Sequence, residues 1–345
     1  MRTPFMAKRI LALLLVSVWL VVSGGCSHQA PTEAGKVQEK STEITVAVEY
    51  TDHAAGFYVA QEKGWFDEAG LQVRSCNVYA TGTALAAALT KGDIDVAYIC
   101  LVPALTAYAH GGVPLKIVAG THKNGYALVA NQTKVREVKD LEKEEVKIAN
   151  MQPGSTTDLL FTLLLRQKGL NEEKILARTA RMNPAKQLLA LQTGKVDAVF
   201  VPEHFATMAG KLPGMGVLAR SQDIWPDMQG SVLIVTEGLL KKDPQAVEKL
   251  RSINARALDY INRYPEEAAN IVAARLNEYQ SVVKNEMASP EASLEVTPAI
   301  VRESMVNLRY TPDLEAQEVQ KVIDLMESYG YLKNPVSAEQ LWSKP

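Results

Sequence analysis

Cysteine is scarce in this chain, with three among 345 residues. A disulfide-stabilised scaffold uses more, and Cys26 directly follows an apolar segment, which leaves Cys76 and Cys100 as a candidate pair. These two are expected at the ends of the second and third strands. If the strands are ordered 2-1-3, the first strand separates them by about 9–10 Å, whereas a disulfide needs Cα atoms within about 7 Å. We expect two free thiols.

An excess of basic residues is also missing. The 37 lysines and arginines face 39 aspartates and glutamates, which gives a formal net charge of −2. Residues 1–25 contain three basic residues and no acid, so the chain from Cys26 onward carries 34 basic against 39 acidic groups, or −5. Such a balance offers no basic surface for nucleic acid. We therefore expect no nucleic-acid partner.

The common motifs of catalysis are absent. The sequence has no Gly-x-Ser-x-Gly, no His-Glu-x-x-His, and no Gly-Lys-Ser/Thr of a phosphate-binding loop. No two of its five histidines have the spacing of a metal-ligand pair such as His-x-x-x-His. We expect a protein that is not an enzyme and that uses no cofactor and no metal.

One long apolar run lies near the N-terminus. Two adjacent basic residues precede residues 10–22, which are apolar except for one serine. The run is short for a membrane span and has the length of a signal-peptide core. Small residues and then Cys26 follow, which resembles the lipidation box of bacterial lipoproteins, although Ser23 stands where that box prefers Leu. We predict a signal peptide over residues 1–25, a lipid on Cys26 and anchoring at the extracytoplasmic face of the cell membrane. A secretory signal cut nearby is the alternative.

The rest of the chain divides by pattern. Residues 26–43 are mostly polar with alternating charges, which is typical of a flexible tether. The length that follows allows one large domain or two medium ones. We expect residues 44–125 to form the first part of lobe 1 and residues 126–230 to form lobe 2. Residues 231–345 should return to lobe 1 as a strand and a set of C-terminal helices.

The stretch that organises the fold covers residues 44–76. A β-branched strand begins at Ile44 and stops before Asp52. Residues 56–68 then place apolar side chains every three to four positions, which predicts a helix, and Gly70 ends it before the next strand. A strand, a helix and a second strand form a βαβ unit. In open α/β folds, ligands bind at the carboxyl edge of such a sheet.

A sequence pattern that occurs twice in the chain, which we call the internal repeat, suggests two related lobes. Residues 89–99 (LTKGDIDVAYI) match residues 191–201 (LQTGKVDAVFV) at six of eleven positions, and Pro103 and Pro202 follow the two copies. Helix-Gly-strand corners also converge by chance in α/β proteins. The number of like positions favours a duplicated lobe, and the spacing is too long for a solenoid repeat.

Two helix starts carry the chemistry of a binding loop. Residues 152–158 (QPGSTTD) and 81–83 (TGT) combine glycine with hydroxyl side chains beside the unpaired amides of a helix N-terminus. Those amides favour an anion or a polarised oxygen. Ordinary N-caps have the same composition, so residue type alone leaves both interpretations open.

Residues 55–73 (AGFYVAQEKGWFDEAGLQV) resemble the opening of the solute-binding proteins of the nitrate, sulfonate and taurine import group, which includes binders of thiamine-precursor pyrimidines. Residues 140–170 and 260–276 resemble the same family, so the likeness covers most of residues 44–276. The resemblance implies an α/β, two-lobed clamshell of the type II periplasmic-binding-protein class. Each lobe should be a mostly parallel sheet flanked by helices, with two crossing strands between the lobes.

The resemblance also implies a function. Such a protein captures a small organic or anionic solute of the sulfonate, nitrate or taurine kind between its lobes and presents it to the permease subunits of an ABC importer. We expect a monomer whose other partner is the membrane, through the lipid anchor. The alternatives are a binder of a thiamine-precursor pyrimidine or another heterocycle and, because fungal thiamine-precursor synthases share the fold, an enzyme. Lys123 is the one obvious cation expected near the cleft, which keeps neutral solutes open.

The candidate site follows from the expected topology, because loops after parallel strands converge on the cleft. Three histidines, His53, His122 and His204, are expected near it, where they could contact the solute. The ligand-binding residues that the sequence predicts are Asp52, His53, Phe57, Tyr79, Thr81, Gly82, Thr83, Cys100, His122, Gly154, Ser155, Thr156 and Glu203.

Overall fold

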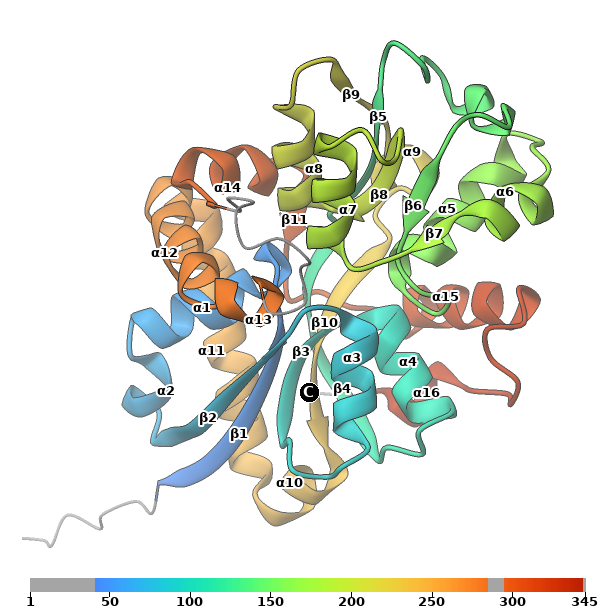
Figure 1. Cartoon of the computed structure of the whole chain (residues 1–345). Coiled ribbons are helices and arrows are strands. Elements are labelled where there is room, and N and C mark those ends of the chain that lie inside the picture. The colour runs from blue at the N-terminus through green and yellow to red at the C-terminus, as the bar shows by residue number, and fades with distance from the viewer. Residues whose placement is uncertain (1–40, 285–294, 344–345) are drawn as a thin grey trace, which may run out of the picture. The chain divides into compact units, whose positions relative to one another are not determined.

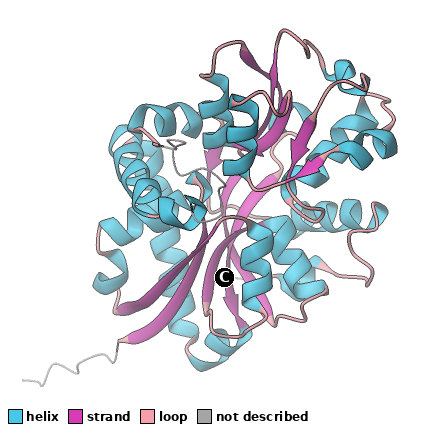
Figure 2. Cartoon of the chain, in the orientation of Figure 1, coloured by secondary structure: helices cyan, strands magenta, loops and turns pink. Residues whose placement is uncertain are grey.

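The structure, a computed structural model, describes residues 41–284 and 295–343. Cys26, the expected signal peptide and nearly all of the expected tether lie outside the described residues. The described chain forms two β-sheets, and helices cover both faces of each sheet (Figure 1). Figure 2 shows the alternation of strands and helices that the βαβ pattern predicted.

The first sheet contains six strands, which are β1 (Thr42–Glu49), β2 (Leu71–Tyr79), β3 (Val96–Cys100), β4 (Leu115–Asn124), β10 (Gln229–Thr236) and β11 (Leu308–Tyr310). Their order is β11-β4-β10-β3-β1-β2, so β1 lies between β2 and β3 as the 2-1-3 order predicted. β1 pairs in parallel with both neighbours, whereas β10 is antiparallel to β3 and β4, and β11 to β4. Cys76 and Cys100 are both free thiols, as expected.

The second sheet contains five strands, which are β5 (Tyr126–Asn131), β6 (Ile148–Asn150), β7 (Ala180–Arg181), β8 (Ala198–Pro202) and β9 (Met215–Arg220). Their order is β7-β6-β8-β5-β9. β6 pairs in parallel with β7 and β8, and β5 is antiparallel to β8 and β9. Most strands of each sheet therefore share one direction, but the pairing in both sheets is mixed.

The helices of the first part of the chain are η1 (Asp52–Ala54), α1 (Ala55–Glu62), α2 (Trp65–Glu68), α3 (Gly82–Leu89), α4 (Leu101–Ala109), η2 (Val138–Glu142), α5 (Thr156–Gln167), α6 (Glu172–Arg178), α7 (Pro184–Gln192), α8 (Glu203–Gly210) and α9 (Ser221–Ile224). The later helices are α10 (Glu237–Lys242), α11 (Pro244–Arg263), α12 (Pro265–Glu278), α13 (Gln280–Lys284), α14 (Pro298–Met305), α15 (Ala316–Ser328) and α16 (Ala338–Leu341).

Two hydrophobic clusters fill the faces of the sheets. Because strand residues alternate between faces, Val46 and Val48 of β1 join one cluster and Ala47 joins the other. The first cluster includes residues of α1, α11, α12, α7 and α8, and the second includes residues of α3, α4, α5 and α15. Each cluster draws on both sheets, so the described core is continuous between them.

The internal repeat, residues 89–99 and 191–201, corresponds to equivalent helix-to-strand turns in the two sheets. Asp95, before β3, accepts the Thr45 amide of the neighbouring strand at 2.8 Å. Asp197, before β8, accepts the Lys147 amide ahead of β6 at 2.9 Å. Each aspartate thus connects the starts of two neighbouring parallel strands by a hydrogen bond. This contact explains why the Gly-x-x-Asp pattern occurs in both sheets.

Two local expectations differ from the structure. The single helix expected over residues 56–68 is divided into α1 and α2 because Gly64 adopts a positive φ of 70° between them. The set of C-terminal helices expected within residues 231–345 is interrupted, because α14 ends at Met305 and strand β11 follows. A three-residue edge strand is too short to leave a period-2 pattern, which is why it was missed.

The chain passes between the sheets twice. The first passage joins β4 to β5 through Gly125, and the second runs from α9 to β10. The Asn124 amide donates to the Met228 carbonyl at 2.9 Å, so the two passages are hydrogen-bonded to each other. This arrangement matches the two crossing segments that the sequence predicted.

Candidate functional site

The carboxyl ends of several strands meet where the two sheets approach each other. The side chains gathered there form what we call the junction cluster, which consists of Glu49, Asp52, His53, Cys100, His122, Tyr126, Glu203 and His204. Every member is at most 4% exposed. Lobe 1 supplies five of them, and β5 and α8 of lobe 2 supply Tyr126, Glu203 and His204. A buried cluster of polar side chains therefore joins the two sheets.

Asp52 is the most connected side chain of the junction cluster. His204 Nδ1 donates to Asp52 Oδ1 at 3.2 Å across the lobes, and the Ser304 hydroxyl donates to Oδ2. The Tyr310 hydroxyl donates to the Asp52 carbonyl at 3.1 Å. Burial favours the protonated acid, but the contacts with His204 and Ser304 outweigh it and hold the pKa of Asp52 below its usual range.

The two histidines of lobe 1 lie against each other beside the first passage between the sheets. The ring centroids of His53 and His122 are 4.2 Å apart with the rings tilted, and His53 Nε2 donates to the Gly125 carbonyl at 2.8 Å. Burial lowers the pKa of His53 to about 4. Burial and the proximity of His53 also lower the pKa of His122 well below its usual value. Both rings are therefore uncharged at neutral pH.

A chain of hydrogen bonds links Tyr126 of lobe 2 to Glu49 of lobe 1. The Tyr126 hydroxyl donates to Cys100 Sγ at 3.0 Å, and the Cys100 thiol donates to Glu49 Oε2 at 3.2 Å. Burial, with the Glu49 carboxyl nearby, raises the pKa of the Cys100 thiol well above its usual value. Cys100 is therefore protonated at neutral pH, and a protonated thiol is a poor nucleophile.

Glu203 begins α8 and pairs with Arg220 from the end of β9. Burial raises the pKa of Glu203 to about 7 in spite of the opposing charge of Arg220. Oε1 takes the ion pair, while Oε2 has no hydrogen-bond partner among the described residues. The Asn307 side chain also favours the charged form of Glu203, so both Arg220 and Asn307 stabilise this buried carboxyl.

Several other buried polar atoms near the junction also have no hydrogen-bond partner among the described residues. They are both ring nitrogens of His122, His204 Nε2, Thr156 Oγ1, Gln229 Oε1 and the hydroxyl of Tyr50. Buried polar groups in folded proteins are nearly always hydrogen-bonded, so a group of unsatisfied ones marks a place where a ligand or water completes the structure.

The two predicted helix starts behave as N-caps. Thr81 accepts the Ala84 amide at 3.2 Å, and Ser155 accepts the Asp158 amide at 3.2 Å. A cavity of about 350 Å³ between α3 and α4 is lined by Thr83 of lobe 1 and by Gly154 of lobe 2, among others. The structure therefore brings the two helix starts to a common cavity, although the Thr81 and Ser155 hydroxyls are engaged by their own helices.

The remaining predicted residues lie apart from the junction cluster. Phe57 packs in the apolar core, with ring centroids 5.6 Å from both Phe66 and Tyr98. Tyr79, the last residue of β2, is half-buried and packs against the second hydrophobic cluster. The sequence did not predict Glu49 or Tyr126 as site residues. An acid that ends an apolar strand, as Glu49 does, is the signal that was available.

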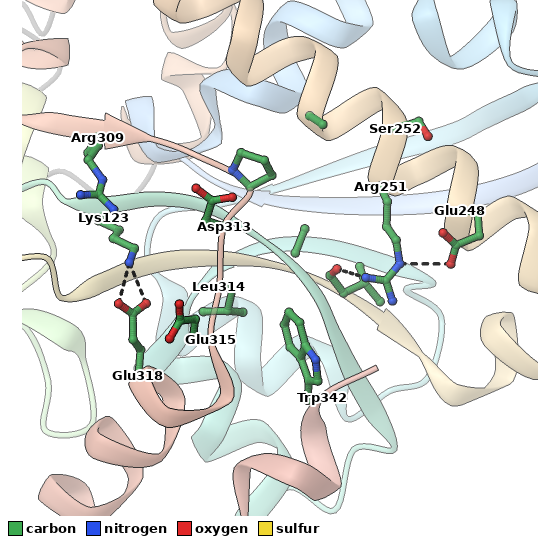
Figure 3. Close-up of a pocket in the computed structure, with 14 residues that line it drawn as sticks. Lys123, Glu248, Arg251, Ser252, Arg309, Asp313, Leu314, Glu315, Glu318 and Trp342 are labelled. Atoms are coloured by element: carbon green, nitrogen blue, oxygen red, sulfur yellow. Dashed lines mark hydrogen bonds and ion pairs between the residues drawn. The ribbon is translucent and has the colours of Figure 1, made fainter. Parts of the chain in front are cut away.

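A larger cavity of about 730 Å³ lies outside the junction, against α11, β4 and the segment that follows β11 (Figure 3). Its charged groups are largely paired: Lys123 Nζ lies 2.7 Å from Glu318, and Arg251 Nε lies 3.2 Å from Glu248. All of its lining residues belong to the first sheet and its helices. Lys123, the cation expected near the cleft, therefore lines this separate cavity and is paired there with Glu318.

Neither a metal site nor a membrane-spanning helix is found in the described residues 41–284 and 295–343. No group of three or more His, Cys, Asp and Glu side chains there is arranged to hold a metal ion. Within the same residues, no helix has the length and apolar character needed to cross a membrane.

The structure has the periplasmic-binding-protein fold, a two-lobed clamshell. It consists of two mixed β-sheets flanked by helices, with a buried polar cluster between them. Two solved structures share it. The ligand-binding component of an ABC-type import system from Staphylococcus aureus gives a TM-score of 0.68 at 17% identity, over 88% of this chain and 96% of that one. The alkanesulfonate-binding protein of Xanthomonas axonopodis pv. citri gives 0.72 at 17% identity, over 88% and 99%.

Sequence comparison assigns the family. The model of the NMT1-like family matches residues 37–277, so this chain belongs to that family. A protein of Brucella abortus (strain 2308), named as a binding protein without a stated ligand, is 24% identical over 287 residues, which cover 82% of this chain and 84% of that protein. The resemblance seen in the sequence to solute-binding proteins of the sulfonate and nitrate group is confirmed.

Proposed function

We propose that this protein is the solute-binding component of an ABC importer and that it captures a small solute at the junction cluster. Family membership and the clamshell fold support this role, and the structural neighbour from Staphylococcus aureus is described as the ligand-binding component of such a system. The other neighbour is described as binding alkanesulfonates, which makes sulfonates the first solutes to test. The partners in this role are the solute and the permease subunits, and the protein acts as a monomer.

One observation carries the proposal. Buried polar atoms without a hydrogen-bond partner among the described residues come from both lobes: His122 belongs to lobe 1, and Thr156, Glu203 and His204 belong to lobe 2. A solute enclosed among these atoms can bond to both lobes at once, and this differential contact is what favours the closed arrangement over an open one.

A binding role fits the chemistry better than catalysis. The Cys100 thiol is held protonated, so no thiolate nucleophile is prepared in the cluster. Hydrogen bonds within the cluster, such as that of His53 to the Gly125 carbonyl, fix side chains in place instead.

Closure on the solute can be measured directly. Contacts such as Asp52–His204 join the lobes in this structure, and opening must break them. We expect small-angle scattering to give a smaller radius of gyration when a bound solute is present, by hinge bending without refolding. A thermal-shift screen of sulfonates, nitrate, pyrimidines and flavins identifies solutes to use. A solute that raises the melting temperature but leaves the radius unchanged would contradict the clamshell mechanism.

We also propose that the protein is a lipoprotein held at the extracytoplasmic face of the cell membrane through Cys26. The support comes from the sequence, because the apolar run and the small residues before Cys26 have the form of a lipoprotein signal. Cys26→Ser should move the protein from the membrane fraction to the soluble fraction, because the lipid is its anchor. Cys76→Ser, which removes a different thiol, is the control. Equal membrane retention of Cys26→Ser and the parent would show that the anchor lies elsewhere.

A further inference from the structure

Glu49 ends β1 and directs its carboxyl at the start of α4. Oε1 accepts the backbone amide of Cys100, the N-cap of α4, at 2.6 Å, and Oε2 accepts the Cys100 thiol at 3.2 Å. The first amides of a helix carry a partial positive charge and attract anions. A carboxyl group of the chain itself therefore occupies the place that an external anion would take at this helix.

The start of α3 also approaches this carboxyl. A Cβ atom on Gly82 would lie 2.5 Å from Glu49 Oε1 and 2.8 Å from Pro103 Cγ. Only glycine leaves room at position 82 for the buried acid. The amide at the start of α4 thus donates to Glu49, and the start of α3 at residues 81–83, where an anion was expected, lies beside the same carboxyl.

The cations near the junction are already neutralised by the chain. Arg220 pairs with Glu203, Arg181 pairs with Asp158 near the start of α5, and Lys123 pairs with Glu318 in the separate cavity (Figure 3). Burial keeps the pKa of His53 at about 4, so this ring does not supply a positive charge at neutral pH. The junction cluster therefore contains acids, a thiol, the Tyr126 hydroxyl and the uncharged rings of His53 and His122, together with the His204 ring that donates to Asp52.

We infer that Glu49 sets the charge preference of the cleft, so that the protein takes an uncharged or cationic solute that donates hydrogen bonds and excludes anions such as nitrate and sulfonates. This inference rests on the solute-binding role proposed above and narrows its substrate class. Carboxyl groups that could accept hydrogen bonds from such a solute are present in both lobes: Glu49 in lobe 1 and the buried Glu203 in lobe 2. A hydrogen bond between charged partners contributes roughly ten- to a hundred-fold in affinity.

Three probes of one shape separate the charge classes. Benzenesulfonate, benzamide and benzamidine share a ring and carry an anionic, a neutral and a cationic head group, and nitrate is added as a small anion. We expect calorimetry on the parent protein to give at least about tenfold tighter binding for benzamide or benzamidine than for either anion. Glu49→Gln should weaken benzamidine by roughly ten- to a hundred-fold and change benzamide less. The control is Glu145→Gln, which removes one exposed charge far from the junction.

The pH profile gives an independent readout. Burial raises the pKa of Glu49 to about 7, so the group is neutral below that pH and charged above it, and benzamidine should bind more tightly as pH rises through 7. The groups that face Glu49 from other elements are Cys100, which titrates far above this window, and Tyr126 beyond it. Glu203, which pairs with Arg220, also has a pKa of about 7. The pH profile of benzamidine affinity in Glu49→Gln contains only the contribution of Glu203, so comparing it with the parent profile isolates the contribution of Glu49.

The outcomes distinguish the inference from the function on which it rests. Binding of benzenesulfonate or nitrate without benzamide or benzamidine overturns the inference and leaves the solute-binding role intact. Binding of none of the probes, with no change in scattering, overturns both. Unchanged benzamidine affinity in Glu49→Gln also overturns the inference. If that variant does not fold, the parent profile decides, and benzamidine affinity that stays constant from pH 6 to 8 rejects the role of Glu49.

Discussion

Asp52→Ala will lower the free energy of unfolding by about 3–5 kcal/mol at pH 7, because the substitution breaks a buried charged network and leaves its partners unpaired. Asp52 is fully buried and accepts hydrogen bonds from His204 of lobe 2 and from Ser304 of α14. Without this carboxylate, His204 Nδ1 loses the acceptor to which it donates inside the protein. Denaturant unfolding followed by circular dichroism measures the loss.

Two variants and the pH profile test the physical cause. Asp52→Asn keeps the volume and one acceptor oxygen, so it should lose less than alanine does. Asp93→Ala removes an exposed acid of lobe 1 and should change stability by less than about 0.5 kcal/mol. The pKa of Asp52 is lowered in the folded state, so its contribution is present above the unfolded value near 4 and is lost as pH falls further. A difference between parent and Asp52→Ala that stayed constant down to acidic pH would exclude this network as its source.

The sequence predicted the order of the first three strands because the βαβ rule is a strong geometric constraint. A strand, a crossover helix and a second strand allow one handedness and a narrow set of neighbours, and β2-β1-β3 followed. The return strand expected within residues 231–345 corresponds to β10, but its antiparallel pairing was not predicted, because hydrophobic alternation carries no information on strand direction. The short strands β7 and β11 have two and three residues, too few for any periodic signal.

The candidate site was predictable where it follows chain topology. Asp52, His53, Cys100 and Glu203 lie directly after strand ends, and the structure gathers them in the junction cluster. Whether each contacts a solute remains a prediction. Partners that arrive from remote segments could not be foreseen. Ser304 lies 252 residues from Asp52 along the chain, and no local pattern joins them.

The same limit applies to the role of the helix starts. Glycine and hydroxyl residues at residues 81–83 and 152–158 fit an anion site or an N-cap equally well. In the structure Thr81 and Ser155 act as N-caps at these two starts. Glu49 accepts the amide at the start of α4, which it reaches only after β1 and β3 have paired. The inference on the charge of the solute therefore depends on tertiary structure.

The two non-glycine residues with positive φ in the described chain lie where the chain passes between the sheets. They are Asn124 (φ 63°) and Asp227 (φ 58°). Asn and Asp adopt left-handed conformations more readily than other non-glycine residues, because their short polar side chains can hydrogen-bond locally. Asp227 also forms an ion pair with Arg309 at 3.0 Å. The backbone changes direction at these two passages, and we expect a change in lobe angle to occur there.

Gly125→Ala will consequently destabilise the closed arrangement by about 2–4 kcal/mol, through an unfavourable φ together with crowding. Gly125 adopts a φ of 93°, and a Cβ there would lie 3.0 Å from His53 Nε2 and 3.1 Å from the Leu308 side chain. We expect a rotation at Gly125, which lies between β4 and β5, to relieve both contacts. We expect a larger radius of gyration without solute and apparent affinity weakened by roughly thirty-fold or more for any solute that binds the parent.

Gly92→Ala separates hinge opening from ordinary backbone strain. Gly92 has a comparable φ of 77° between α3 and β3, and a Cβ at this position would meet no described atom within 4 Å. Alanine there should lower stability by about 1–2 kcal/mol while the radius of gyration and the solute affinity stay those of the parent. If both variants lose stability alike and neither changes the radius, the passage at Gly125 is merely strained. A change confined to Gly125→Ala means that the passage beside His53 sets the lobe angle, because the His53 ring contacts both the hinge and the solute site.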